Sequence, residues 1–430
     1  MSLSVIGIIL ALVVLVVLCY KRVNLTLASI ICGIIVIVTS SLPVLETIKV
    51  NYMQGFGGYI VSNFLMFSLS ALFGKVLEDS GAAAAFAKIL CNALGRFSAY
   101  GCMIATAVLV YGGVSVFVIV FTMYPIFLPV FKESNLPSRF IPGAIFGSSC
   151  TFACSMMPGT PTVNNLIPTQ YLGTTAMAAP VVGLVTSAIS IILIYLYFEY
   201  EFRNARKRGE GFDSNITITE VAVTQTMEID KKLGYMALIP MIVLISTLNI
   251  FKLDIIVSLL LGTVVGFSIF WNKIEDKGNC IEKGVAGATV AIINTASVIG
   301  FGKIAQSTVG FQSIIDSVTE IGGNPLISIG LATTLISGAT GSGTGGIGIS
   351  MEILADRYLQ MGVNPEAIHR VVSIASNGLD SLPHNGLVIT TLSTCNTSHK
   401  DGYKAVFVTS VLITCLALVI AMVLGGIIYQ

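Results

Sequence analysis

Apolar stretches about 20 residues long recur from one end of this chain to the other. A helix needs about 20 residues to cross the ~30 Å hydrocarbon core of a bilayer, and stretches such as 3–20, 174–200 and 404–428 suit that purpose. Only 10% of the residues are charged, and the mean hydropathy is +0.89, whereas a soluble domain carries about a quarter charged residues. We therefore expect an all-α polytopic membrane protein, because helices satisfy their own backbone in lipid.

Two further segments, 98–131 and 324–360, fit a simple crossing poorly. Each is interrupted near its middle by small residues, YGGVS at 111–115 and SGATGSGTGG at 337–346. The apolar arm before the second interruption is only about 21 Å long at 1.5 Å per residue, so we predict re-entrant hairpins. The predicted spans are 3–20, 24–43, 56–74, 138–171 (broken), 174–200, 233–250, 254–271, 285–305, 366–395 (broken) and 404–428.

The positive charges indicate an orientation. Lys21 and Arg22 follow the first apolar run instead of preceding it, which predicts a membrane span and not a signal peptide. With the N-terminus outside, most of the 23 Lys and Arg residues fall in cytoplasmic loops. The exceptions are Lys49, Lys252, Lys303, Arg357 and Arg370. Both termini are therefore expected outside a bacterial inner membrane, and residues 201–232 are expected to form a cytoplasmic linker.

The two halves of the chain resemble each other. FGKV at 73–76 returns as FGKI at 301–304, and PGTPTV at 158–163 is matched by PHNGLV at 383–388. Each half would hold five spans, one of them broken, and one hairpin; because five is odd, the second copy would be inverted. Inverted repeats with discontinuous helices are typical of secondary transporters. The predicted division is a first repeat at 1–200, the linker, and a second repeat at 233–430.

The stretch SNGLDSLPHNGLV, residues 376–388, breaks one predicted span with polar residues. Pro383 removes a backbone donor and Gly386 permits unusual dihedrals. The N–H groups freed at a half-helix N-terminus suit a carboxylate, and the carbonyls freed at a C-terminus suit a cation or a proton-bearing group. The alternative interpretation is structural: the polar residues would form a hydrogen-bonded contact between two helices, without water or a ligand. The polar residues of the two breaks are Thr160, Thr162, Asn164, Asn165, Asp380, His384 and Asn385.

The hairpin tips carry hydroxyl groups between glycines. Glycine-rich membrane segments more often mediate helix packing, but ten consecutive small residues between two half-length arms favour close backbone approach to a ligand. Ser115 occupies the equivalent place in the first hairpin. The residues predicted to bind substrate are Ser115, Thr160, Thr162, Asn164, Ser342, Thr344, His384 and Asn385.

No Lys or Arg is expected at the middle of the membrane. An anion would then be held by dipoles, hydroxyls, amides and a protonated His384, which suits one carboxylate better than two or three. His369 and His399 fall near helix ends and are expected to be solvated. Glu352 is expected either to titrate or to pair with Arg357. No metal or other cofactor is expected, and a net charge of +1 gives no reason to expect a nucleic-acid partner.

The chain resembles the gluconate permease family, within the wider ion transporter superfamily, over nearly its whole length after residue 55. The residues that carry the resemblance are GFGG (55–58), FGKVLEDSGAA (73–83), MPGTPTVNNLIPT (157–169), NPEAIHRVVSIASNGLDSLPHNG (364–386) and SHKDGYK (398–404). The resemblance implies a homodimer with a fixed scaffold, proton-coupled uptake of an organic acid by an elevator motion, and a site at the hairpin tips and breaks. Gluconate transporters carry an acidic residue in the first hairpin, which YGGVSVF (111–117) lacks, so another small carboxylate such as a hydroxy acid is favoured.

The coupling ion and the class of protein leave alternatives open. Asp380 and His384, one helical turn apart, would carry the proton as a coupled pair. Sodium coupling would instead use carbonyls and hydroxyls at both breaks. An intramembrane enzyme could use the same pair as acid and base, but it would not need the matching break at 158–165. A passive channel is disfavoured by the closed hairpins and the lack of a charged ring.

Overall fold

The computed structural model describes residues 3–21, 23–212, 230–319, 324–383 and 385–429. Every regular element in these residues is a helix, and six helices are long and apolar enough to cross a membrane. The expectation of an all-helical chain with several apolar spans is confirmed. Shorter apolar helices accompany the six, because several of the chain's apolar stretches are interrupted before they reach a full crossing length.

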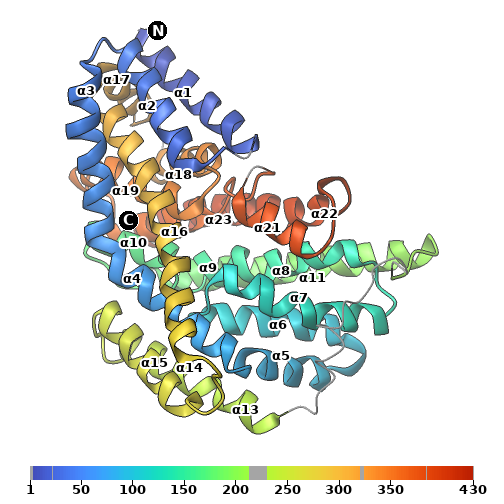
Figure 1. The fold of residues 1–430 in the computed structure, drawn as a ribbon. Coiled ribbons are helices and arrows are strands. Elements are labelled where there is room, and N and C mark those ends of the chain that lie inside the picture. Colours follow the sequence, from blue (N-terminus) through green and yellow to red (C-terminus); the bar gives the residue numbers. More distant parts are fainter. Residues whose placement is uncertain (1–2, 22, 213–229, 320–323, 384, 430) are drawn as a thin grey trace.

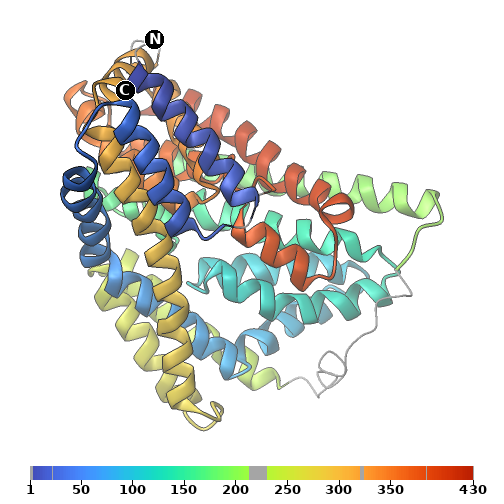
Figure 2. The ribbon, with the colours of Figure 1, turned by 45° about the horizontal axis from the view of Figure 1, so that its top comes forward.

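Two long helices run side by side through the molecule (Figures 1 and 2). The first comprises α3 (Val44–Thr47), the π-helical turn η1 (Ile48–Tyr52) and α4 (Met53–Asp79); the second is α16 (Lys277–Gln306). Small residues let their backbones approach closely. A Cβ atom on Gly55 would lie 3.0 Å from the carbonyl oxygen of Ile299, and one on Gly300 would lie 2.9 Å from that of Tyr52.

Short helices flank the two ends of this long pair. Helices α1 (Leu3–Tyr20) and α2 (Leu25–Thr39) lie at one end, and α13 (Lys231–Met236), α14 (Leu238–Asn249) and α15 (Ile255–Phe270) lie at the other (Figure 1). The packing is reciprocal between the halves of the chain, because α2 packs on α16 and α15 packs on α4.

The segments expected as hairpins are each two packed helices joined by a tight turn. The first pair is α6 (Ser98–Tyr111) and α7 (Val116–Glu133), and the second is α18 (Pro325–Thr340) and α19 (Gly343–Gln360). Helix α5 (Ala82–Ala93) precedes the first pair and packs along α6. The corresponding helix before the second pair, α17 (Val309–Thr319), was not expected from the sequence.

Both segments expected to be broken helices are interrupted in the structure. In the first half, η3 (Ser138–Phe140), α8 (Ile141–Phe146), η4 (Gly147–Thr151) and α9 (Phe152–Ser155) run without a gap, and α10 (Val163–Leu172) follows a seven-residue loop. In the second half, α20 (Pro365–Ser376) ends ten residues before the first residue of α21 (Gly386–Thr394). Pro158 and Pro161 lie in the first gap, shortly after α9 ends, and Pro383 lies in the second gap. Helix α20 already ends at Ser376, seven residues before Pro383, so this proline does not end it.

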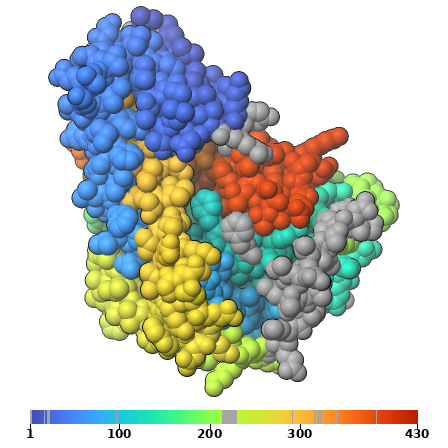
Figure 3. All heavy atoms as spheres, viewed as in Figure 1, coloured from blue at the N-terminus to red at the C-terminus, as the bar shows by residue number. Residues whose placement is uncertain are grey.

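Two long terminal helices complete the halves. Helix α11 (Pro180–Lys207) packs against the C-terminal helix, which comprises α22 (His399–Val406), η5 (Phe407–Leu412) and α23 (Ile413–Ile428). Helix α11 continues to Lys207, so the segment expected as a linker begins with helix. In the space-filling view, the chain around α21 and α22 lies over first-half helices (Figure 3).

Candidate functional site

The first helix break is held open by main-chain hydrogen bonds. Gly159 has φ of 80° and donates its N–H to the carbonyl of Ala176 at 2.9 Å. The Thr162 hydroxyl donates to the carbonyl of Cys154, near the end of α9. Thr160 is completely buried, yet its hydroxyl has no hydrogen-bond partner among the described residues. A buried hydroxyl without a partner carries a desolvation cost, and this one lies in the loop of the first break.

The second break is closed at one end by Asn385. Its Oδ1 accepts the N–H groups of Leu387 at 2.6 Å and Val388 at 3.0 Å, so Asn385 serves as the N-cap of α21. The Asp380 carboxylate accepts the Ser381 hydroxyl at 2.8 Å, and Ser381 in turn lies 2.9 Å from the Ser410 hydroxyl. His384, predicted to bind substrate and carry a proton, lies outside the described residues.

The two breaks meet through side-chain amides. Nδ2 of Asn164 donates to Oδ1 of Asn377 at 2.6 Å and to the Ser376 hydroxyl at 2.9 Å. Nδ2 of Asn377 donates to the carbonyl of Cys150 at 2.6 Å. All of these side chains are buried. The side-chain amide of Asn164, a predicted site residue, thus joins the two breaks.

The tip of the second helix pair lies against both breaks. A Cβ atom on Gly343 would lie 2.8 Å from Nδ2 of Asn164, 2.8 Å from Oδ1 of Asn377 and 2.9 Å from Oδ2 of Asp380. Ser342 is the N-cap of α19, and its hydroxyl accepts the N–H of Gly345 at 3.2 Å and lies 3.3 Å from the Thr344 hydroxyl. The structure therefore brings the predicted residues of this tip next to those of the breaks, and a side chain at Gly343 would require polar atoms of the junction to shift.

Ser115 lies apart from this cluster. It precedes α7, and its backbone nitrogen would be 3.4 Å from a Cβ atom on Gly74 of α4. In the part of the chain that the structure describes, no hydrogen bond joins Ser115 to either break. The first helix pair reaches the break through Tyr111 instead, whose hydroxyl donates to the carbonyl of Pro158 at 3.1 Å.

One arginine places a buried positive charge next to the first break. Arg370 is 0% exposed, and its guanidinium donates to the carbonyls of Ala178 at 2.7 Å and Ser155 at 3.1 Å and to Oδ1 of Asn165 at 3.0 Å. None of the described carboxylates forms an ion pair with it. The expectation that no Lys or Arg lies at the middle of the membrane stays a prediction, whereas the counting of Arg370 among the loop charges is wrong, because Arg370 is buried in α20. Arg370 was assigned to an outer loop although it falls inside the predicted span 366–395, and that position was the signal in the sequence.

His369 is also buried. It is 0% exposed, and its ring nitrogens lie 2.7 Å from the Thr174 hydroxyl and 3.2 Å from Oδ1 of Asn165. The expectation of a solvated His369 is wrong because α20 packs against both α10 and α23. Oδ1 of Asn165 thus accepts hydrogen bonds from two adjacent residues of α20, His369 and Arg370. Its Nδ2 donates to the carbonyls of Thr160 and Ala176, each at 2.9 Å.

Glu352 pairs with a lysine that the sequence did not suggest. Its carboxylate forms an ion pair with Lys303 of α16 and accepts the Tyr171 hydroxyl at 3.0 Å. The sequence left open whether Glu352 titrates or pairs with Arg357, and the ion pair that the structure describes for Glu352 is the one with Lys303. The difference arises because α19 packs directly on α16, which no pattern within the segment 324–360 could reveal.

Comparison with known proteins identifies the family. The model of the GntP family permeases matches residues 2–247. The uncharacterized transporter YxjC of Bacillus subtilis is 31% identical, over 90% of this chain and 92% of its own length. The chain belongs to the GntP permease family. An uncharacterized transporter of Haemophilus influenzae is 25% identical, over 83% of each chain.

Solved structures of transporters share the fold of this GntP family member. The YdaH transporter of Alcanivorax borkumensis, described as having an unusual topology, aligns with a TM-score of 0.58 at 13% identity and covers 89% of this chain and 88% of its own. MtrF of Neisseria gonorrhoeae, described among antimetabolite efflux pumps, aligns with a TM-score of 0.57 at 14% identity and covers 90% and 84%. The protein is a multi-pass membrane transporter of the GntP kind, as the resemblance in its motifs predicted, and the family favours a transporter over an enzyme.

Proposed function

We propose that this GntP family permease is a secondary active transporter that couples the uptake of a small organic monocarboxylate to protons. The observation that carries the proposal is Arg370, a buried guanidinium that forms no ion pair with the described carboxylates. A charge at such a depth is costly and marks a functional position by default. Its positive potential, close to the first break, favours an anion.

The charges of the site suggest how a proton and an anion would travel together. Arg370 contributes a fixed positive charge, and Asp380 contributes a negative charge only while it is ionised. When Asp380 takes up a proton from the outside, the site becomes more positive by one unit, which favours the entry of one carboxylate. With the proton and the carboxylate both bound, the net charge of the site equals that of the empty site with Asp380 ionised. The site then releases the proton and the carboxylate on the other side of the membrane. His384 remains a proposed second proton carrier.

The polar groups that would hold the carboxylate lie at the N-terminus of α10. Thr162 precedes this helix and makes no side-chain capping hydrogen bond, while its carbonyl accepts the N–H of Asn165 at 3.0 Å. The N–H groups of Val163 and Asn164, which make no described hydrogen bond, would be open to an anion. The Thr160 hydroxyl, buried and without a described partner, lies in the same loop. By contrast, Asn385 already caps α21. Ser342 and Thr344 supply hydroxyls from the opposing tip, which suits a hydroxy acid or a gluconate-like substrate.

We further propose an elevator motion within a homodimer. The two broken helices are tied together by Arg370 and by the pair Asn164–Asn377, so they would move as one body against α4 and α16. Helices α1, α2, α14 and α15 expose many large apolar side chains and would form the scaffold and dimer contacts. Both termini would lie outside the bacterial inner membrane, and the two halves would be inverted repeats with re-entrant hairpins.

Flux into proteoliposomes containing only this protein tests the proposal. Labelled organic acids are screened with an inward proton gradient, and we expect accumulation of a monocarboxylate that a protonophore abolishes. An absolute requirement for a sodium gradient at equal pH would replace proton by sodium coupling. For the elevator, Ser342→Cys in a background without reactive cysteines should change its labelling from outside when the transported acid is added. Unchanged labelling in a transport-competent variant would contradict the motion.

A further inference from the structure

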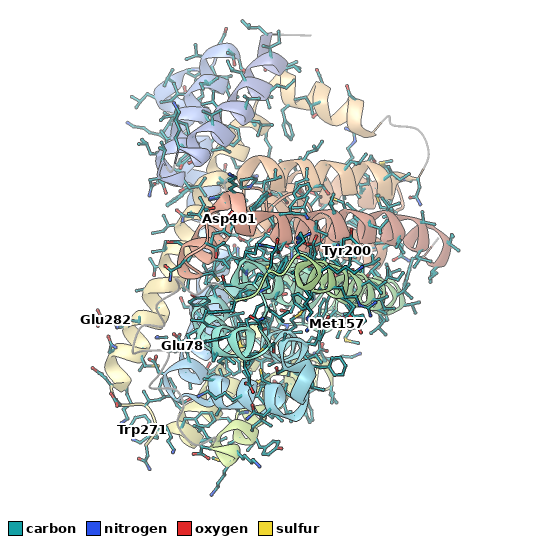
Figure 4. All side chains as sticks on the ribbon, turned by 90° about the vertical axis from the view of Figure 1, so that its right-hand side faces the viewer. Glu78, Met157, Tyr200, Trp271, Glu282 and Asp401 are labelled. Carbon is teal, nitrogen blue, oxygen red and sulfur yellow. The ribbon has the colours of Figure 1, made fainter. Side chains whose placement is uncertain are left out.

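An apolar groove lies on the side of the molecule formed by α6, α9 and α11. It has a volume of about 380 Å³, and its lining includes Ile104, Tyr111, Met157, Ile191 and Tyr195. Several of these side chains are at the surface, since Ile104 is 48% and Ile191 is 45% exposed. Figure 4 shows Met157 beside α11 on this side of the molecule. The groove is separate from the junction of Asn164, Asn377 and Gly343 described above.

The face of α11 that borders the groove changes character along the helix. Ile191 and Tyr195 line the groove, Glu199 follows one turn later, and Arg203 and Arg206 follow at the same helical spacing. The Tyr195 ring lies 5.1 Å from the Tyr100 ring, centroid to centroid. This helix face therefore runs from aliphatic through aromatic to charged residues, with Glu199 before the two arginines, and it spans about 12 Å from Tyr195 to Arg203 at 1.5 Å per residue.

The cationic end of this face keeps an unused positive charge. Glu199 accepts the Tyr100 hydroxyl at 3.0 Å and the Nε–H of Arg203 at 2.7 Å, so it is already shared between two partners. Arg206 is exposed and forms no ion pair with the described residues. Lys207 follows it, and then Arg208, which forms an ion pair with Glu210 at 2.8 Å. This charge lies beyond the tyrosine end of the groove, about 16 Å along α11 from Tyr195 to Arg206 at 1.5 Å per residue, and it is complementary to an anion.

We propose that this groove is a binding site for an anionic phospholipid. One acyl chain would lie between α6 and α11, the tyrosine pair would lie at the level of the glycerol, and the phosphate would bind Arg206 and Arg203. Aromatic side chains prefer this level of the bilayer, and basic pockets at the cytoplasmic side of membrane helices hold anionic headgroups. At the far end, Tyr111 bonds the carbonyl of Pro158, so the lipid would contact the helix pair that supports the first break.

Native mass spectrometry of the purified full-length protein tests the site with phosphatidylglycerol and phosphatidylcholine at equal concentration. We expect preferential retention of phosphatidylglycerol, and a roughly tenfold or greater loss of that preference in Arg203→Gln/Arg206→Gln, because each basic residue contributes about fivefold near an anionic surface. Lys277→Gln, which removes a positive charge at the start of α16, away from the groove, should leave the preference unchanged. Ala107→Trp should fill the groove and lower retention without altering any charge.

A second measurement locates the lipid in a bilayer. The chain has one tryptophan, Trp271, so Trp271→Phe/Ile104→Trp carries a single fluorophore at the groove. Phosphatidylglycerol with brominated chains should quench it at a lower mole fraction than brominated phosphatidylcholine, and Arg203→Gln/Arg206→Gln should remove the difference. Equal quenching by both lipids, retention unaffected by Ala107→Trp, or conversion of a dimer to monomers by the groove variants would each overturn the proposal, the last by making the groove an interface between copies.

Discussion

The side-chain amide of Asn164 donates a 2.6 Å hydrogen bond to Oδ1 of Asn377 and so joins the two broken helices at their interruptions. The two residues are 213 positions apart in the chain. Asn377 also donates to the carbonyl of Cys150 in η4, between α8 and α9. Because each of these groups is buried, the loss of one leaves others without a partner.

Replacing Asn377 by Ala should therefore destabilise the protein. The change removes the donor to the carbonyl of Cys150 and the acceptor for the amide of Asn164. We expect the free energy of unfolding to fall by about 2–4 kcal/mol, because two buried groups lose their partner at about 1–2 kcal/mol each. Thermal unfolding in detergent measures the change, with the exposed residue substitution Asn272→Ala as the control. A double-mutant cycle with Asn164→Ala should show strong coupling; additive effects would mean that the pair does not act as a unit.

Thr160→Val should separate ligand binding from stability. The hydroxyl has no described partner, so its replacement by a methyl group should leave the melting temperature of the ligand-free protein unchanged or slightly higher. Substrate affinity should fall by about 1–3 kcal/mol if the hydroxyl binds the carboxylate. The matched control is Thr409→Val, whose hydroxyl bonds the carbonyls of Gly143 and Ala405; it should lose stability. Unchanged substrate affinity in Thr160→Val would remove this hydroxyl from the site.

Gly343→Ala should disturb the junction of the tip with both breaks. The added Cβ would lie under 3.0 Å from polar atoms of Asn164, Asn377 and Asp380, and overpacking of this kind costs about 1–3 kcal/mol. We expect weaker substrate binding, measured by isothermal calorimetry once the acid is known. Gly287→Ala is the matched control, since a Cβ atom there has no neighbour within 4 Å. Equal behaviour of the two variants would show that the tip accommodates a side chain.

Substitution of Arg370 should test both structure and charge. Arg370→Gln leaves the carbonyls of Ser155 and Ala178 without their donor. We expect the free energy of unfolding to fall by about 3 kcal/mol or more, since hydrogen bonds to charged groups contribute about 1.5–3 kcal/mol each. Arg370→Lys keeps the charge with fewer donors and should retain more anion binding than Arg370→Gln at a similar melting temperature. Equal anion affinity in the two folded variants would contradict an electrostatic role for this residue.

Asp380→Asn should separate coupling from exchange. The amide cannot carry a proton, so accumulation driven by a pH gradient should be abolished, whereas exchange of labelled for unlabelled substrate should persist. Both are measured in the same proteoliposomes. Ser381→Ala, which removes the hydroxyl bonded to Asp380, should shift the pH dependence of uptake and keep accumulation. A variant Asp380→Asn that still concentrates substrate on a pH gradient would show that another group carries the proton.

The sequence by itself determined the local structure of this protein. Apolar runs of span length, prolines 158, 161 and 383, and small residues at 111–115 and 337–346 are local features, and hydrophobicity and backbone sterics act on them within a few residues. The all-helical fold and the family followed from such features. The sequence also placed Arg370 inside a predicted span, although the orientation argument counted it among the loop charges.

Only the tertiary structure decided which residues meet. The contacts of Asn164 with Asn377, of Arg370 with Ser155 and Ala178, and of Glu352 with Lys303 join segments far apart in the chain. Such pairs depend on how whole helices cross, and helix crossing follows from the packing of many side chains at once. The same packing placed Ser115 against α4 and buried His369, although the sequence around each residue gave no sign of either partner.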